Sequence, residues 1–193
     1  MCQKRNKILS LFCSNLKSRY HLREISKLSK IPVKTTFRNL IELEKENIVK
    51  SKHEGRHKYF ELNLDNIKTK FLLQETEIYR TLLFLEKYPI FKSFLKEIEL
   101  PACSVIIFGS FAELAATKDS DLDVLIISEE KELELPFYLL PYKIHKIVLN
   151  RSELLKGLEK KEPLLMEILS NHIVLLNHSF FIDLVWWYYG KKA

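Results

Sequence analysis

Residues 108–127 read FGSFAELAATKDSDLDVLII, and this stretch decides the fold. The apolar residues that lead up to Gly109 predict a buried strand, and the residues after it predict a short helix. Asp121–Ile127 then predicts a second strand. Because side chains two positions apart on a strand point to the same face, we expect the carboxylates of Asp121 and Asp123 to lie together.

This pattern carries a definite chemistry. Two carboxylates on one strand face suit a divalent cation with oxygen ligands, Mg²⁺ above all, whose shell is completed by phosphate oxygens and water. Gly109 permits a close backbone approach, and Ser110 opens a helix whose first N–H groups can face a triphosphate. The combination predicts phosphoryl or nucleotidyl transfer. An isolated Asp-x-Asp is more often a solvated turn or a helix cap, but the Gly-Ser step upstream favours the site.

The order of strand, Gly-Ser, helix and Asp-x-Asp strand resembles the polymerase-β-like nucleotidyltransferase superfamily, particularly its small prokaryotic members, over about residues 100–176. The resemblance implies Mg²⁺ (or Mn²⁺) held by Asp121 and Asp123, and an NTP bound by Gly109, Ser110 and Ser120. It also implies transfer of a nucleoside monophosphate to a hydroxyl acceptor. Since such domains often act as antitoxins, a Tyr or Ser of a toxin partner is one acceptor to consider.

One feature departs from that superfamily. Its full site has a third carboxylate on a later strand, whereas the expected strand Lys143–Leu149 contains no Asp or Glu and places His145 or Lys146 there. His145 could serve as a base in its place, although a hydrogen-bonded structural histidine is the commoner outcome. The alternative function is therefore a DNA-binding regulator or antitoxin whose nucleotidyltransferase domain is catalytically degenerate.

The basic charge belongs to the N-terminal third. Residues 1–63 carry a net charge of +9, whereas residues 64–193 carry −3. Three short helices followed by two β-prone runs around Gly55 resemble a winged helix-turn-helix domain. That resemblance, with the charge, implies DNA as a partner. The residues expected to contact it are Lys34, Thr35, Thr36, Arg38, Lys52, Arg56 and Lys58. A protein-binding module with solvent-exposed lysines on its surface would have the same net charge.

We therefore expect an α+β protein in three parts. Residues 1–64 form the winged helix-turn-helix, residues 65–100 form long connecting helices, and residues 101–193 form a nucleotidyltransferase-like α/β domain with a small mixed sheet. The first connecting helix is a candidate contact in a homodimer, because two half-sites on DNA suit a two-fold axis. Beyond the two strands already described, the pattern predicts a helix at 110–116, a strand at 143–149, helices at 152–160 and 163–170, a strand at 173–176 and a helix at 180–189.

The composition excludes several classes of protein. No apolar run reaches the ~18 residues that a membrane span needs, and the start lacks a cleavage site for secretion. The three cysteines are far apart, which indicates neither a disulfide framework nor a zinc site. We therefore expect a cytoplasmic protein with no membrane partner.

Overall fold

The chain divides into two compact units in a computed structural model that describes residues 2–98, 103–130 and 133–190. One unit contains the residues up to Thr76 together with the end of the chain from Tyr189, and the other is Glu77–Tyr188. The division falls inside the long helix α4, Ile67–Lys87, which contributes to both units. The sequence had suggested a separate connecting segment at 65–100, of which residues 99 and 100 lie outside the described ranges.

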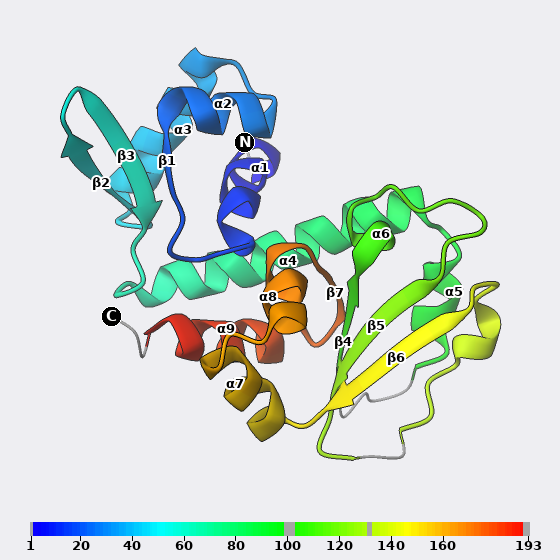
Figure 1. Cartoon of the computed structure of the whole chain (residues 1–193). Coiled ribbons are helices and arrows are strands. Elements are labelled where there is room, and N and C mark those ends of the chain that lie inside the picture. Colours follow the sequence, from blue (N-terminus) through cyan, green and yellow to red (C-terminus); the bar gives the residue numbers. More distant parts are fainter. Residues whose placement is uncertain (1, 99–102, 131–132, 191–193) are drawn as a thin grey trace. The chain divides into compact units, whose positions relative to one another are not determined.

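The first unit contains three helices, a small antiparallel sheet and the start of α4 (Figure 1). A capping box between His21 and Glu24 begins the second helix, and Lys30, in the left-handed conformation, ends it. Gly55 provides the positive φ, +59°, at the tip of the hairpin. The strands have the order β1-β3-β2. The elements are α1 Cys2–Cys13, β1 Arg19–His21, α2 Leu22–Ser29, α3 Val33–Lys45, β2 Val49–Glu54 and β3 His57–Leu62.

The second unit is built on a four-stranded mixed sheet with the order β6-β5-β4-β7. Strand β4 pairs antiparallel with both β5 and β7, whereas β5 and β6 are parallel. The mixed sheet confirms the predicted α+β class. The strands are β4 Ser104–Phe108, β5 Leu122–Ile127, β6 Ile144–Leu149 and β7 Ile173–Leu176, and the helices are the end of α4, α5 Phe91–Lys96, α6 Gly109–Ala112, the 3₁₀ turn η1 Phe137–Leu139, α7 Arg151–Glu159, α8 Pro163–Ser170 and α9 His178–Gly190.

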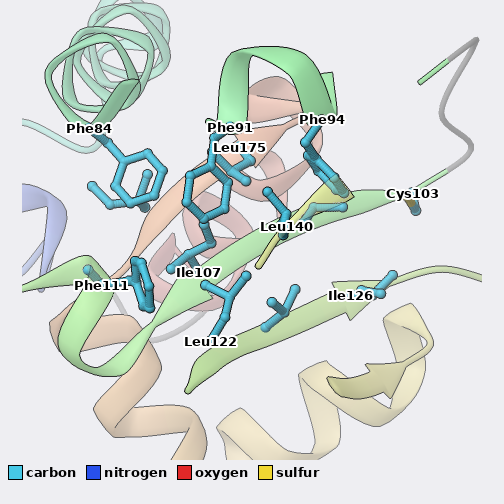
Figure 2. Close-up of a cluster of buried hydrophobic side chains, with 14 residues drawn as sticks. Phe84, Phe91, Phe94, Cys103, Ile107, Phe111, Leu122, Ile126, Leu140 and Leu175 are labelled. Carbon is cyan, nitrogen blue, oxygen red and sulfur yellow. The ribbon is translucent and has the colours of Figure 1, made fainter. Parts of the chain in front are cut away.

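One face of this sheet packs against an aromatic cluster. Figure 2 shows the rings of Phe84, Phe91 and Phe94 facing the strands that carry Ile107 and Leu122. Both of these aliphatic side chains are fully buried. Since strand side chains alternate, the residues on either side of Leu122 must face away from the cluster. This burial fixes the direction in which Asp121 and Asp123 point.

Two local predictions were wrong in detail. The sequence did not predict the short strand β1, which lies between the first two helices and pairs with β3. The helix after Gly109 ends at Ala112 instead of Ala116, because the chain turns at Leu114, whose φ is +58°.

Within the described residues, no helix combines the length and apolar character that crossing a membrane requires.

Candidate active site

Asp121 immediately precedes β5 and Asp123 is its second residue, and both lie on the sheet face opposite the aromatic cluster. Leu122, between them, has no exposed surface, whereas the side chains of Asp121 and Asp123 are 40% and 30% exposed. The apolar residue thus anchors the strand while its polar neighbours remain accessible. This is the shared orientation that the spacing of the two aspartates predicts.

Gly109 makes room for one of these carboxylates. It follows β4 directly and has a φ of +65°, a conformation that residues with a side chain rarely adopt. A Cβ atom at this position would lie 2.5 Å from Oδ2 of Asp123. The backbone conformation therefore favours glycine here, and a larger residue would also displace the carboxylate of Asp123.

Strand β6 and the residue before it bring a histidine and a lysine to the aspartate pair. Its parallel register places His145 opposite Asp123. The imidazole lies between the carboxylates, with Nδ1 3.3 Å from Oδ1 of Asp123 and Nε2 3.5 Å from Oδ2 of Asp121. Nζ of Lys143 also lies 3.5 Å from Oδ2 of Asp121. An imidazole thus occupies the place where the resemblance would put a third carboxylate.

Lys143 was missed as a site residue by sequence reasoning. A usable signal existed, because Lys143 and His145 are two positions apart, as Asp121 and Asp123 are, and so share a face of the sheet. The backbone N–H of Leu122 donates a hydrogen bond to the carbonyl of Lys143 at 2.8 Å, which holds the start of the two strands together.

The two serines expected to bind a nucleotide have different surroundings. The hydroxyl of Ser120 accepts a hydrogen bond from the N–H of Thr117 at 2.9 Å, so it closes the turn that leads into β5. Ser110 is half-buried in the first turn of α6. Its carbonyl accepts a hydrogen bond from the N–H of Ala115 at 2.9 Å, which ties down the loop beyond this short helix.

A pocket of about 530 Å³ opens beside the loops that lead into β5 and β6. Thr117 connects it to the turn at Ser120, and Tyr142 immediately precedes Lys143. Burial raises the pKa of the Tyr88 phenol, so this group stays neutral and presents an uncharged wall. The residues that line the pocket are Tyr88, Ala116, Thr117, Lys118, Pro141 and Tyr142.

The donor set suits a divalent cation in part. Mg²⁺ is usually held by one or two carboxylates together with phosphate oxygens and water, and Asp121 and Asp123 provide such a pair. The space left at Gly109 lets the carboxylate of Asp123 lie against the backbone. Throughout the described part of the chain, however, no three His, Cys, Asp or Glu side chains already form a metal-binding group.

Comparison with known proteins identifies the class of this unit. Residues 91–180 match the family model "Polymerase beta, Nucleotidyltransferase". The matched stretch contains all four strands of the mixed sheet and the residues of the site described above. No curated protein and no solved structure matches the chain significantly. The match supports a nucleotidyltransferase-type fold for the second unit.

The residues expected to contact DNA all lie in the first unit. Lys34 and Arg38 are exposed on the first two turns of α3, and a polar groove of about 470 Å³ includes Thr35 and Arg38. Thr36 is fully buried, and its hydroxyl donates to the carbonyls of Ile31 and Pro32. Thr36 therefore holds the start of α3 and faces the interior of the unit.

The remaining basic candidates lie on the hairpin. Lys52 and Arg56 are exposed, whereas Nζ of Lys58 lies 3.0 Å from Oε2 of Glu44 in an ion pair. A hydrogen bond from the Ser51 hydroxyl, and next the contacts with Lys58, lower the pKa of the Glu44 carboxyl despite some burial. The charge of Lys58 is thus partly neutralised within the unit.

Proposed function

We propose that the second unit transfers a nucleoside monophosphate from a divalent-cation complex of an NTP to a hydroxyl acceptor. The observation that carries this proposal is the pair Asp121 and Asp123 beside Gly109, inside the stretch that matches the nucleotidyltransferase family. Both carboxylates are accessible on one face, and nucleotidyl transfer needs such a pair to hold the cation of its substrate.

In the proposed reaction, the acceptor oxygen attacks the α-phosphorus of the NTP. A new oxygen–phosphorus bond forms, the bond from that phosphorus to the oxygen bridging to the β-phosphorus breaks, pyrophosphate leaves, and the hydroxyl proton is released to water. The cation, when bound, neutralises charge on the phosphates. Asp121 and Asp123 position it, and the backbone at Gly109 and Ser110 faces the phosphates. Ser120 supports this arrangement by closing the turn before Asp121.

The pocket beside Tyr88 and Tyr142 supports the nucleotide assignment. We propose that the nucleobase lies in this pocket, because its aromatic lining suits the flat face that every base offers for stacking. A tyrosine or serine hydroxyl on a protein, such as a toxin partner, is the acceptor that we propose.

A labelling experiment tests the reaction. The full-length protein is incubated with Mg²⁺ or Mn²⁺ and each NTP labelled at the α-phosphorus, together with candidate acceptor proteins. We expect Asp121→Asn and Asp123→Asn to abolish label transfer, and the control Asp119→Asn, an exposed neighbour in the preceding loop, to retain it. Equal labelling by the wild type and both site variants would exclude these aspartates from the reaction.

A second function, a regulator whose nucleotidyltransferase domain no longer catalyses, is favoured by one observation. His145 lies opposite Asp123, where a third carboxylate would complete the site. A degenerate domain of this kind would bind an NTP without turnover. Calorimetry of NTP binding, run beside the labelling assay, separates binding with transfer from binding alone.

We propose that the first unit is a winged helix-turn-helix that binds DNA. The order of helix, short strand, two helices and hairpin supports this assignment, with α3 as the helix that enters the major groove. Its exposed Lys34 and Arg38 and the excess of positive charge in residues 1–63 favour a nucleic-acid partner. We further propose a homodimer, because Ile67 and Phe71 of α4 expose 56% and 60% of their surface.

A further inference from the structure

The side chain of His145 lies next to both carboxylates of the proposed cation site. Its imidazole is within 3.5 Å of Asp121 and 3.3 Å of Asp123, and its side chain is 50% exposed. The parallel pairing of β5 and β6 fixes this proximity, since His145 is the register partner of Asp123. The pairing of two strands, and not the conformation of a loop, therefore places the imidazole nitrogens beside the carboxylates.

The two ring nitrogens at present face different carboxylates. A single cation can bond to only one of them, so the ring has to turn for His145 to become a ligand. An exposed side chain changes rotamer readily, and the carboxylates would exchange the imidazole contact for the cation. The described residues hold no three-residue group that is already arranged around a metal ion, so binding requires this turn of the ring.

The positive charge of Lys143 weakens the electrostatic attraction between the two carboxylates and a cation such as Mg²⁺. Nζ of Lys143 lies 3.5 Å from Oδ2 of Asp121 and offsets part of the negative charge of the pair. Mg²⁺ depends on that charge and prefers oxygen donors, whereas imidazole is a good ligand for first-row transition ions. Two carboxylates and one imidazole thus favour transition ions over Mg²⁺ more than three carboxylates would.

We propose that His145 is the third protein ligand of the divalent cation and that it biases the site toward ions such as Co²⁺ and Zn²⁺ relative to Mg²⁺. This inference rests on the proposed function, because it concerns the cation of the same site. It goes further in assigning a ligand role to His145 and in stating the class of cation that the domain selects.

Binding of Co²⁺ to the full-length protein tests the ligand role without any assay of turnover. Calorimetry measures the affinities for Co²⁺ and Mg²⁺, and proton NMR of the Co²⁺ form reports an imidazole N–H signal shifted by the paramagnetic ion. We expect His145→Ala to weaken Co²⁺ binding by about tenfold or more, to leave Mg²⁺ binding nearly unchanged and to remove the shifted signal.

Two further variants make the result specific. His145→Asp should lower the preference for Co²⁺ over Mg²⁺ below that of the wild type, because it supplies a third oxygen donor. His53→Ala removes another exposed imidazole and should bind both ions as the wild type does. Circular dichroism confirms that each variant is folded, and His145→Gln replaces His145→Ala if the latter is not.

The outcomes separate this inference from the proposed reaction. Loss of Co²⁺ affinity in His145→Ala, without label transfer by the wild type, would support the ligand role and refute nucleotidyl transfer. Absence of Co²⁺ binding by the wild type, an unchanged ratio of the two affinities in His145→Ala, or an equal loss in His53→Ala would overturn the ligand role, whatever the labelling assay shows.

Discussion

Substitution of Gly109 should affect both the stability of the protein and its binding of a divalent cation. In Gly109→Ala, the new Cβ would lie 2.5 Å from Oδ2 of Asp123, and this carboxylate can rotate away because it ends a flexible side chain. We expect a stability loss of about 1–2 kcal/mol from the left-handed backbone. We also expect loss of divalent-cation binding, measured by calorimetry, because Asp123 no longer points at the site.

Gly55→Ala is the matched control for this variant. Gly55 has a similar φ of +59°, but nothing lies within 4 Å of the Cβ that would be added. It should show a similar stability loss in thermal unfolding and normal cation binding. If both variants bound the cation equally well, the close contact between Gly109 and Asp123 would have no role in the site.

His178 should make the stability of the second unit depend on pH. Burial lowers its pKa below the ordinary 6.5, although the charge of Glu77 and a hydrogen bond with Val174 act in the opposite direction. Its Nε2 lies 2.9 Å from the hydroxyl of Thr81. Because the folded state favours the neutral ring, this contribution to stability is full above a pH of about 6.5 and is lost as the pH falls through the folded pKa.

Thermal unfolding in buffers on either side of that value measures the effect. The melting temperature should be lower in the acidic buffer, and His178→Gln should reduce the difference between the two buffers. His53→Gln, which removes an exposed histidine, should leave the difference unchanged. A difference that is the same in the wild type and in His178→Gln would assign the pH dependence to other groups.

At the scale of elements, sequence patterns predicted what is local. The apolar run of β5 and its alternation placed Asp121 and Asp123 on one face, and the structure has them there. The contact of His145 with both carboxylates depends on the register between β5 and β6, whose paired residues are 22 positions apart in sequence. Local periodicity carries no information on that pairing.

Short elements were the least predictable for a related reason. Strand β1 has three residues, too few to show an alternation, and exists because β3 pairs with it. The end of α6 depends on the left-handed conformation of Leu114, which side-chain propensity does not favour. One unpredicted feature thus depends on a distant strand, and the other on a local backbone conformation that propensity does not favour.

Helix α3 should account for part of the salt dependence of DNA binding. Lys34 and Arg38 are exposed near its start. If each contacts a phosphate, Lys34→Ala and Arg38→Ala should each reduce the slope of log affinity against log salt by about 0.9. Fluorescence anisotropy with a labelled duplex at several salt concentrations measures these slopes.

Lys45→Ala provides the control within the same helix. Lys45 is exposed in the last turn of α3, away from the end that would enter the groove. Its slope should equal that of the wild type. If Lys45→Ala reduced the slope as much as Arg38→Ala does, the salt dependence would reflect the overall positive charge and not a contact made by the start of α3.

At the scale of the whole molecule, the proposed homodimer depends on an apolar face of α4. Ile67 and Phe71 are one turn apart on α4 in the first unit, and both expose more than half of their surface. Burial of a phenylalanine side chain contributes about 1.5–3 kcal/mol, and a two-fold interface would contain the residue twice. Phe71→Glu should therefore weaken a dimer by about 100-fold or more.

Sedimentation equilibrium over a range of protein concentrations measures this dissociation. Lys68→Glu, which adds the same negative group to an exposed position beside the pair, controls for a general effect of charge and should shift the equilibrium less. Since a dimer presents two copies of α3 to one duplex, Phe71→Glu should also reduce DNA affinity, although it leaves Lys34 and Arg38 in place. Identical sedimentation of the wild type and Phe71→Glu as dimers would exclude this face of α4 as the contact.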